Sequence, residues 1–187
     1  MLLGTLEKYQ PDFFPLLGKS FQKEDFCKID LNINTLNFDL ESIQTYDGLD
    51  FYIQEELKRN EAKVGVGGYL EKRVLYQQSN NFKNEAKNRN IHLGVDWWSS
   101  VGTEINAPLE GRVHSFQYND LHLDYGATII LQHDLDGLVF YTLYGHLNLA
   151  SLGNLEKGRF IEKGSVFTAM GNRTENGGWV PHLHFQI

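Results

Sequence analysis

From residue 91 onward the sequence is a series of short apolar segments separated by turn signals, and this pattern limits the possible folds most strongly. Turn-forming stretches such as Asp134 to Gly137 and Asn172 to Gly178 lie between the segments. Their spacing predicts a mainly β fold, a compact and largely antiparallel sheet or sandwich, rather than alternating strands and helices. The expected strands are 111–116, 128–132, 139–143, 159–161, 166–170 and 182–187.

The preceding part of the chain lacks this pattern, and we expect residues 1–63 to be irregular and partly helical. The clearest helix is predicted over residues 50–63, with Asp50 as its N-cap and Gly65 as its stop. Alternating apolar residues within 36–40 predict a short strand.

Residues 64–90 are expected to form a glycine-rich connecting segment and a loop. The glycines that follow Val64 favour tight turns or a close approach of the backbone to its neighbours. The stretch 80–90 is polar and rich in Asn and Lys, which is typical of an exposed loop. We therefore divide the chain into three zones, with a third and functional one over residues 91–187.

Charge and hydropathy exclude some classes of partner. The formal net charge is −7 and no basic run occurs, which argues against a nucleic-acid partner. No apolar stretch is long enough to span a bilayer, so no membrane partner is expected. The first residues lack the features of a signal peptide, which predicts a cytoplasmic location unless a leader has been removed.

Two histidines, His182 and His184, lie two apart in a segment with the composition of a strand. Side chains two apart on a strand point to the same face, with Cα atoms roughly 6 to 7 Å apart. Both imidazoles could bind one metal ion, or one could bind it while the other lines the site. The alternative is a solvent-facing pair on an edge strand.

A second pair of candidate ligands consists of an imidazole and a carboxylate. These are His92 and Asp96, which lie four residues apart. On a straight strand these side chains would stand roughly 13 Å apart, too far to share a zinc ion with bonds of about 2 Å. Gly94 offers a bend that would bring them together. Without that bend, a half-exposed histidine and an aspartate at a strand end are expected.

A third element contains Tyr144, Gly145 and His146. Tyr144 and His146 share one face if the strand continues through them, and Gly145 allows close backbone approach. A single histidine in such a place is more often structural than catalytic.

Together these three elements resemble the M23 family of zinc metallopeptidases, the lysostaphin or LytM type. Its motifs are His-x-x-x-Asp, then Tyr-x-His, then a terminal His-x-His strand, in the order found here. The resemblance covers residues 91–187 and extends to the stretches 102–113, 130–134, 162–164 and 170–171. It implies that His92, Asp96 and His184 bind Zn²⁺ and that His146 and His182 are the catalytic histidines.

The resemblance also implies a mechanism and a substrate class. Three protein ligands leave an open position on zinc, where a water can reach a pKa of about 7. One of His146 and His182 would accept the proton of this water, and the other would assist the oxyanion or the leaving amine. The expected activity is a metalloendopeptidase acting on glycine-containing or peptidoglycan-type peptides. Because the chain ends three residues after His184, one interpretation is a piece of a longer multidomain protein.

Two other functions are compatible with parts of this sequence. A non-catalytic M23-like domain that binds a partner or regulates another hydrolase is the main alternative, although such members usually lose ligands. A biotinyl or lipoyl carrier domain is suggested by the stretch 107–113, but the turn 134–137 carries no lysine for the group.

The remaining aromatic residues and histidines are expected to be structural. Trp97, Trp98 and Trp179 are predicted to be core or pocket wall residues. His133 is expected to be structural, and His114 and His122 to be surface or packing residues. Residues 1–90 either pack beside the β domain or lie over its cleft, with Tyr69 to Glu71 as a possible contribution.

Overall fold

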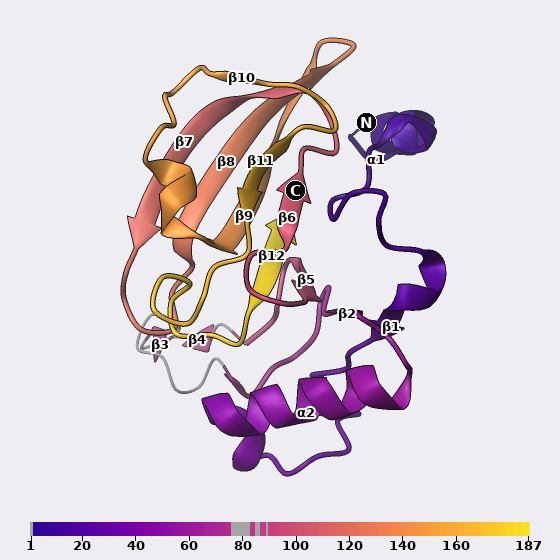
Figure 1. Cartoon of the computed structure of the whole chain (residues 1–187), viewed down its shortest axis with the longest axis vertical. Coiled ribbons are helices and arrows are strands. Elements are labelled where there is room, and N and C mark those ends of the chain that lie inside the picture. Colours follow the sequence, from indigo (N-terminus) through magenta and orange to yellow (C-terminus); the bar gives the residue numbers. More distant parts are fainter. Residues whose placement is uncertain (1, 76–82, 85–86, 89) are drawn as a thin grey trace.

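The computed structural model describes residues 2–75, 83–84, 87–88 and 90–187 (Figure 1). Much of the loop expected at 80–90 lies outside the described residues. Within it, β3 (Lys83–Asn84) and β4 (Lys87–Asn88) pair with each other in an antiparallel manner.

An eight-stranded sheet dominates the fold, in the strand order β1-β2-β5-β12-β9-β8-β7-β10. The pairing of β1 with β2 is parallel, and the other described pairings in this sheet are antiparallel. The predicted mainly β fold is therefore confirmed. Its strands from the C-terminal half are β5 (Val95–Trp98), β7 (Gly111–Asn119), β8 (Gly126–Leu135), β9 (Leu138–Leu147), β10 (Phe160–Ile161) and β12 (His182–Gln186).

A small second sheet covers the main core. It pairs β6 (Glu104–Asn106) with β11 (Val166–Ala169), and Ile105 from β6 is fully buried. On the large sheet, alternate residues such as Ile129 and Leu131 of β8 point towards this layer and are also fully buried. The main core thus lies between the two sheets, away from the predicted site residues.

The N-terminal half contains α1 (Leu2–Tyr9), α2 (Tyr46–Arg59), β1 (Phe26–Lys28) and β2 (Val64–Gly67). Within the described residues, short 3₁₀ helices are found at Gln10–Asp12, Lys23–Asp25, Ser42–Gln44 and Leu149–Leu152. A predicted helix is found in α2, but both of its expected ends are wrong. Thr45 is the N-cap, because its hydroxyl accepts a hydrogen bond from Gly48 N at 3.0 Å, and Gly65 lies inside β2.

The strand expected within 36–40 is also absent from these described residues, so that prediction is wrong. The chain turns here instead, since Leu36 N donates to Asn32 O at 2.8 Å. Phe38 packs on Tyr52 of α2 with ring centroids 5.2 Å apart. Local turn hydrogen bonds and packing on the helix therefore outweigh the alternation of apolar residues.

The two halves of the chain are joined through one sheet. β2 pairs with β5, so that Gly65 lies opposite Trp98 and Gly67 opposite Asp96. The Ile29 carbonyl oxygen lies 2.1 Å from where a Cβ of Gly67 would be, which confirms the predicted close backbone approach. The division at residues 63 and 90 stays a prediction, and the sheet runs across both boundaries.

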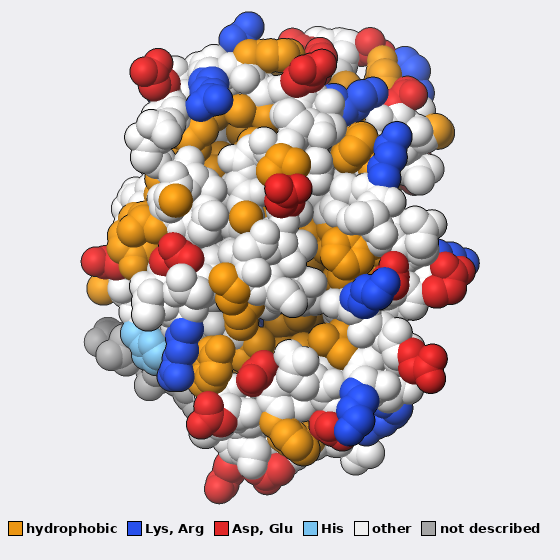
Figure 2. Space-filling model, in the orientation of Figure 1, with side chains coloured by type: hydrophobic (Ala, Val, Ile, Leu, Met, Phe, Trp, Pro, Cys, Tyr) orange, Lys and Arg blue, Asp and Glu red, His pale blue; other side chains and the backbone are white. Residues whose placement is uncertain are grey.

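Under this junction a second hydrophobic core forms between α2 and the sheet (Figure 1). Ile29, Ile53 and Trp98 are among its buried side chains, so it draws on both halves of the chain. On the face seen in Figure 2, Lys and Arg side chains are interspersed with Asp and Glu and form no continuous basic stripe. Among the described residues, no helix combines the length and apolarity needed to cross a bilayer.

Candidate metal centre

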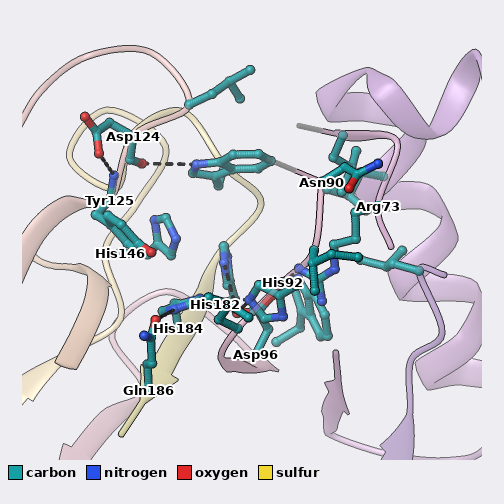
Figure 3. Close-up of a pocket in the computed structure, with 18 residues that line it drawn as sticks. Arg73, Asn90, His92, Asp96, Asp124, Tyr125, His146, His182, His184 and Gln186 are labelled. Carbon is teal, nitrogen blue, oxygen red and sulfur yellow. Dashed lines mark hydrogen bonds and ion pairs between the residues drawn. The ribbon is translucent and has the colours of Figure 1, made fainter. Parts of the chain in front are cut away.

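Three predicted ligands meet at one point of the fold (Figure 3). His92 Nε2 lies 2.9 Å from His184 Nδ1 and 3.2 Å from Asp96 Oδ1, and the last two atoms are 3.1 Å apart. All three side chains are buried. The predicted convergence of two imidazoles and one carboxylate is therefore present.

The sheet and one bend produce this convergence. Asp96 on β5 lies directly opposite His184 on β12 in the antiparallel register. The chain bends at Gly94, as predicted, and this brings His92 back beside Asp96. Gly94 has a second role, because a Cβ there would lie 2.4 Å from His184 Cε1. A side chain at position 94 would thus occupy the place of the third ligand.

The donor atoms suit a small tetrahedral cation. An ion with bonds of about 2.0 to 2.1 Å separates its ligand atoms by about 3.3 Å, close to the distances found here. The Nδ1 of His92 lies 2.7 Å from Gly68 O, and a carbonyl oxygen can only accept. Nδ1 therefore carries the proton, which leaves the Nε2 lone pair for a metal. His184 Nε2 faces Gln186 Oε1 at 3.4 Å, and its Nδ1 joins the triangle.

Two further histidines, His146 and His182, line the same cleft with ring centroids 4.2 Å apart. His146 Nδ1 lies 2.8 Å from Asn176 O, and His182 Nδ1 lies 2.7 Å from Val180 O. Each Nδ1 therefore donates to a backbone carbonyl, and each Nε2 keeps a lone pair. The Nε2 of His182 is 3.9 Å from Asp96 Oδ1.

Burial sets the charges of these groups. It lowers the pKa of His182 to about 4 and holds the pKa of His146 well below its ordinary value. Both imidazoles are therefore neutral at pH 7 and able to accept a proton. Burial would raise the pKa of Asp96, but the guanidinium of Arg73 and the neighbouring imidazoles hold it well below its usual range.

The model of peptidase family M23 matches residues 90–187 of the chain, which is half of its length. The chain belongs to peptidase family M23. An uncharacterized metalloprotease of Haemophilus influenzae is 32% identical over 96 residues, which are 51% of this chain and 18% of that protein. The chain thus spans less than a fifth of this curated relative.

Two of the solved structures that match the chain are peptidases. A zinc-containing peptidase from Vibrio cholerae has 24% identity and a TM-score of 0.44, over 64% of this chain and 31% of that one. The catalytic domain of the antimicrobial peptidase lysostaphin from Staphylococcus simulans has 24% identity and a TM-score of 0.42, over 59% of this chain and 82% of that one.

One expectation about the M23 motifs is wrong: Tyr144 and His146 do not share a face. Tyr144 is fully buried in the main core, where its ring lies 5.3 Å from that of Phe185. His146 has a φ of 62°, in the left-handed region, and the register of β8 with β9 shifts nearby. This irregularity turns His146 to the opposite face, into the cleft. At Gly145 the close neighbour is a side chain, since Tyr125 Cδ1 lies 2.8 Å from the position that a Cβ would take.

Sequence reasoning missed several residues of the M23 site. Arg73 Nη1 lies 2.5 Å from Asp96 Oδ2, and the Tyr125 ring lies 5.1 Å from that of His184. Trp98 stacks on His182 with centroids 5.8 Å apart, and Trp179 lines the cleft, so both are wall residues as predicted. Trp97 packs against the main core. For Arg73, which follows Lys72 in a stretch distant in sequence from every motif, no local signal exists.

The cleft around the M23 site has a volume of about 680 Å³ and two different walls. The C-terminal half contributes the five predicted polar residues with Tyr125 and Trp179. The N-terminal half contributes Leu31, Leu49, Arg73 and Leu75. Residues 1–90 therefore form one side of the cleft. Within the stretch Tyr69 to Glu71, Tyr69 is exposed and Glu71 is buried.

The three remaining histidines lie outside the cleft, as expected. His133 is buried, with Nδ1 2.7 Å from Glu110 O and Nε2 2.7 Å from Thr142 Oγ1. His114 packs on Tyr141 with ring centroids 4.9 Å apart. His122 is exposed.

Proposed function

We propose that this chain is a zinc-dependent metalloendopeptidase in which His92, Asp96 and His184 hold the metal. The proposal is carried by the triangle of donor atoms with two neutral imidazoles beside it in one cleft. Three protein ligands leave one position of a tetrahedral site for water or substrate, which is the pattern of catalytic rather than structural zinc sites.

When bound, zinc supplies Lewis acidity, which polarises a scissile carbonyl and lowers the pKa of a water. His146 and His182 handle the protons. Their Nδ1 atoms are engaged with backbone carbonyls, so each offers an Nε2 lone pair to the cleft. One of the two accepts a proton from the attacking water at Nε2. The other donates to the oxyanion or to the leaving amine only after its own Nε2 has taken up a proton.

The proposed substrate is a peptide. Glycine-containing and peptidoglycan-type cross-linking peptides are the first candidates, because the motifs resemble those of M23 peptidases that cleave them. The cleft volume of about 680 Å³ falls within the usual range for ligand sites, which suits a short stretch of peptide.

The decisive experiment combines elemental analysis with a digest. The purified chain should contain close to one zinc ion per molecule. It should produce new termini in a glycine-rich peptide or a peptide library, detected by mass spectrometry. A chelator should abolish cleavage, and added zinc should restore it. A folded, zinc-loaded chain that binds peptides without cutting any would instead identify a binding or regulatory member of the family.

A further inference from the structure

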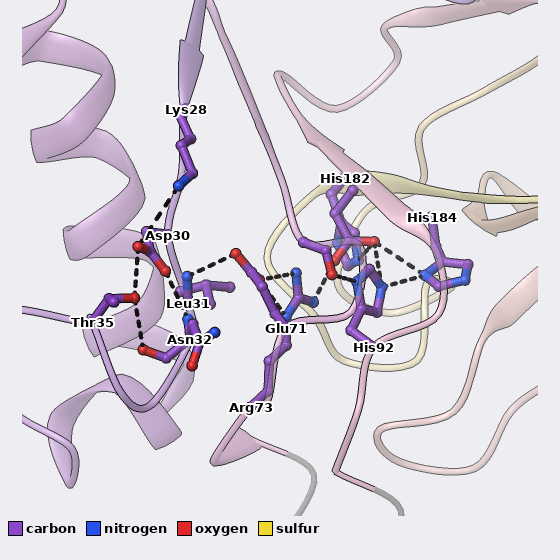
Figure 4. Close-up of polar contacts among 12 residues, drawn as sticks. Lys28, Asp30, Leu31, Asn32, Thr35, Glu71, Arg73, His92, His182 and His184 are labelled. Atoms are coloured by element: carbon purple, nitrogen blue, oxygen red, sulfur yellow. Dashed lines mark hydrogen bonds and ion pairs between the residues drawn. The ribbon is translucent and has the colours of Figure 1, made fainter.

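Arg73 is a buried arginine placed between two carboxylates. Its side chain is 5% exposed. Nη1 lies 2.5 Å from Asp96 Oδ2, while Nε and Nη2 each lie 3.0 Å from Glu71 Oε2. Glu71 is tied further into the N-terminal half, since its Oε1 accepts from Leu31 N at 3.4 Å (Figure 4). A continuous polar chain thus runs from Leu31 to a residue of the metal centre.

The two oxygens of Asp96 have separate partners. Oδ2 faces the guanidinium, and Oδ1 lies within 3.2 Å of the donor nitrogens of His92 and His184. A carboxylate with both oxygens free can rotate and can bind a metal through one or both of them. Here the short contact with Arg73 fixes the rotation and leaves Oδ1 to complete the triangle.

We propose that Arg73 is a positioning residue that restricts Asp96 to binding the metal through Oδ1 alone, and that the Glu71–Arg73 pair belongs to the metal centre. The inference rests on the proposed function, because it takes Asp96 as a ligand. It extends the site to residues that none of the three M23 motifs contains.

Charge explains why Glu71 accompanies Arg73. A lone guanidinium beside the centre would repel a divalent cation and cancel the charge of Asp96. With Glu71 included, two carboxylates and one guanidinium leave a net negative charge of one, which favours cation binding. A buried arginine without such partners would also be strongly destabilising.

The same segment supports a second ligand. Gly68 O accepts from His92 Nδ1 at 2.7 Å, and His92 N donates to Glu71 O at 2.8 Å. Gly68 has a φ of 108°, and a Cβ there would lie 2.1 Å from Arg73 Nη2 and 2.7 Å from His92 Nδ1. Glycine is thus required where Arg73 and His92 come together. Residues 68–73 therefore support two of the three proposed ligands at once.

The test compares Arg73→Gln, Arg73→Lys and Glu71→Gln with the wild-type chain. A matched control is Arg59→Gln, because Arg59 also pairs with a glutamate, Glu56, but its side chain is 69% exposed. Zinc affinity is measured by competition with a chromophoric chelator. The visible spectrum of the cobalt-loaded chain reports the coordination number. Circular dichroism establishes that each variant is folded.

We expect Arg73→Gln to weaken zinc binding about 10- to 100-fold, as is usual when the hydrogen-bond partner of a metal ligand is removed. The intense cobalt bands of a four-coordinate site should weaken as Asp96 becomes free to bind through both oxygens. Arg73→Lys should recover part of the affinity, and Glu71→Gln should lower it. Arg59→Gln should change neither measurement.

A folded Arg73→Gln variant with wild-type zinc affinity and cobalt spectrum would overturn the inference. Should this variant fail to fold, Arg73→Lys and Glu71→Gln decide by the same two measurements, with unchanged values again overturning it. Failure of the proposed function is distinguishable. In that case the wild-type chain itself would bind no zinc, or would bind it without cleaving any peptide.

Discussion

The two walls of the cleft differ in what the sequence reveals about them. The wall from the C-terminal half holds every polar residue of the M23 motifs, on strands and turns whose pattern is visible in the sequence. The wall from the N-terminal half holds a buried ion pair and leucine side chains with no motif at all. Yet Arg73, from the second wall, contacts Asp96 as closely as any residue of the first.

The two walls therefore have different tasks within one site, since one supplies the ligand atoms and the other helps to position them. The imidazoles of the first wall present lone pairs to the cleft, and each has a hydrogen-bond partner on its other ring nitrogen. Side chains of the second wall present no lone pair to a metal, and one of them, Arg73, holds Asp96. The chemistry is thus concentrated in one half of the chain, and the placement of ligands is shared by both.

Removing a proposed ligand from the first wall should have the largest effect. His184→Ala or Asp96→Ala leaves two donors, so zinc content should fall from about one ion per chain to near zero and cleavage should vanish. Plasma mass spectrometry of the dialysed protein measures this. His122→Ala, at an exposed histidine, is the control and should keep its zinc. A ligand variant that retains full zinc would remove the basis for assigning the metal centre.

Next in size is the loss of a proposed catalytic histidine from the same wall. His146→Ala or His182→Ala should keep zinc and lower kcat by about 10²- to 10⁴-fold, the range for loss of general acid or base catalysis. The double variant should be little worse than either single one if the two act as a unit. Zinc content and initial rates are measured on the same samples. Loss of zinc in either single variant would contradict the division between ligands and proton carriers.

The third prediction asks whether the two halves fold as one. Ile29 supports the N-terminal wall and Ile129 the main core, and both are fully buried. Ile29→Ala and Ile129→Ala should each lower the free energy of unfolding by about 2 to 5 kcal/mol. Because both halves share one sheet, each variant should unfold in a single transition, with fluorescence and circular dichroism coinciding. Two separate transitions in Ile29→Ala would show that the second wall is an independent unit.

The smallest effect concerns His133, a histidine of the C-terminal half that lies outside the cleft. Burial lowers its pKa in the folded chain below its ordinary value. The unfolded chain therefore binds more protons below about pH 6.5, and the stability from this group, complete above that pH, is lost as the pH falls towards the folded pKa.

His133→Gln removes this titration. Between pH 6.5 and 5 the variant should lose stability less steeply than the wild type, by at most about 1.4 kcal/mol per pH unit. Urea unfolding at several pH values measures the difference. Parallel slopes for the two proteins would mean that His133 carries the same charge in the folded and unfolded chains.

The sequence predicts the fold and most of the site for identifiable reasons. A strand can be recognised from apolar residues that are close together in the sequence. The strands around His133 and His184 were therefore expected. The bend at Gly94 was also expected, because no straight strand could bring His92 to Asp96. These features depend on local geometry.

What could not be predicted depends on irregular or distant contacts. The left-handed backbone at His146 reverses its side chain, and alternation assigned it to the wrong face. The contact of Arg73 with Asp96 joins residues 23 positions apart through the pairing of β2 with β5. The N-cap of α2 is Thr45, five residues before the predicted cap Asp50, because the Thr45 hydroxyl makes the capping hydrogen bond. A cap depends on one hydrogen bond, which several nearby polar residues could equally have made.

The pairing of β2 with β5 has a practical consequence for anyone isolating the recognisable half. A fragment begun at residue 90 would leave the outer edge of β5 with bare N–H and C=O groups, ready to recruit a strand from another molecule. It would also leave the Asp96 anion without its guanidinium partner. Such a fragment should be prone to aggregation, although it contains all three M23 motifs.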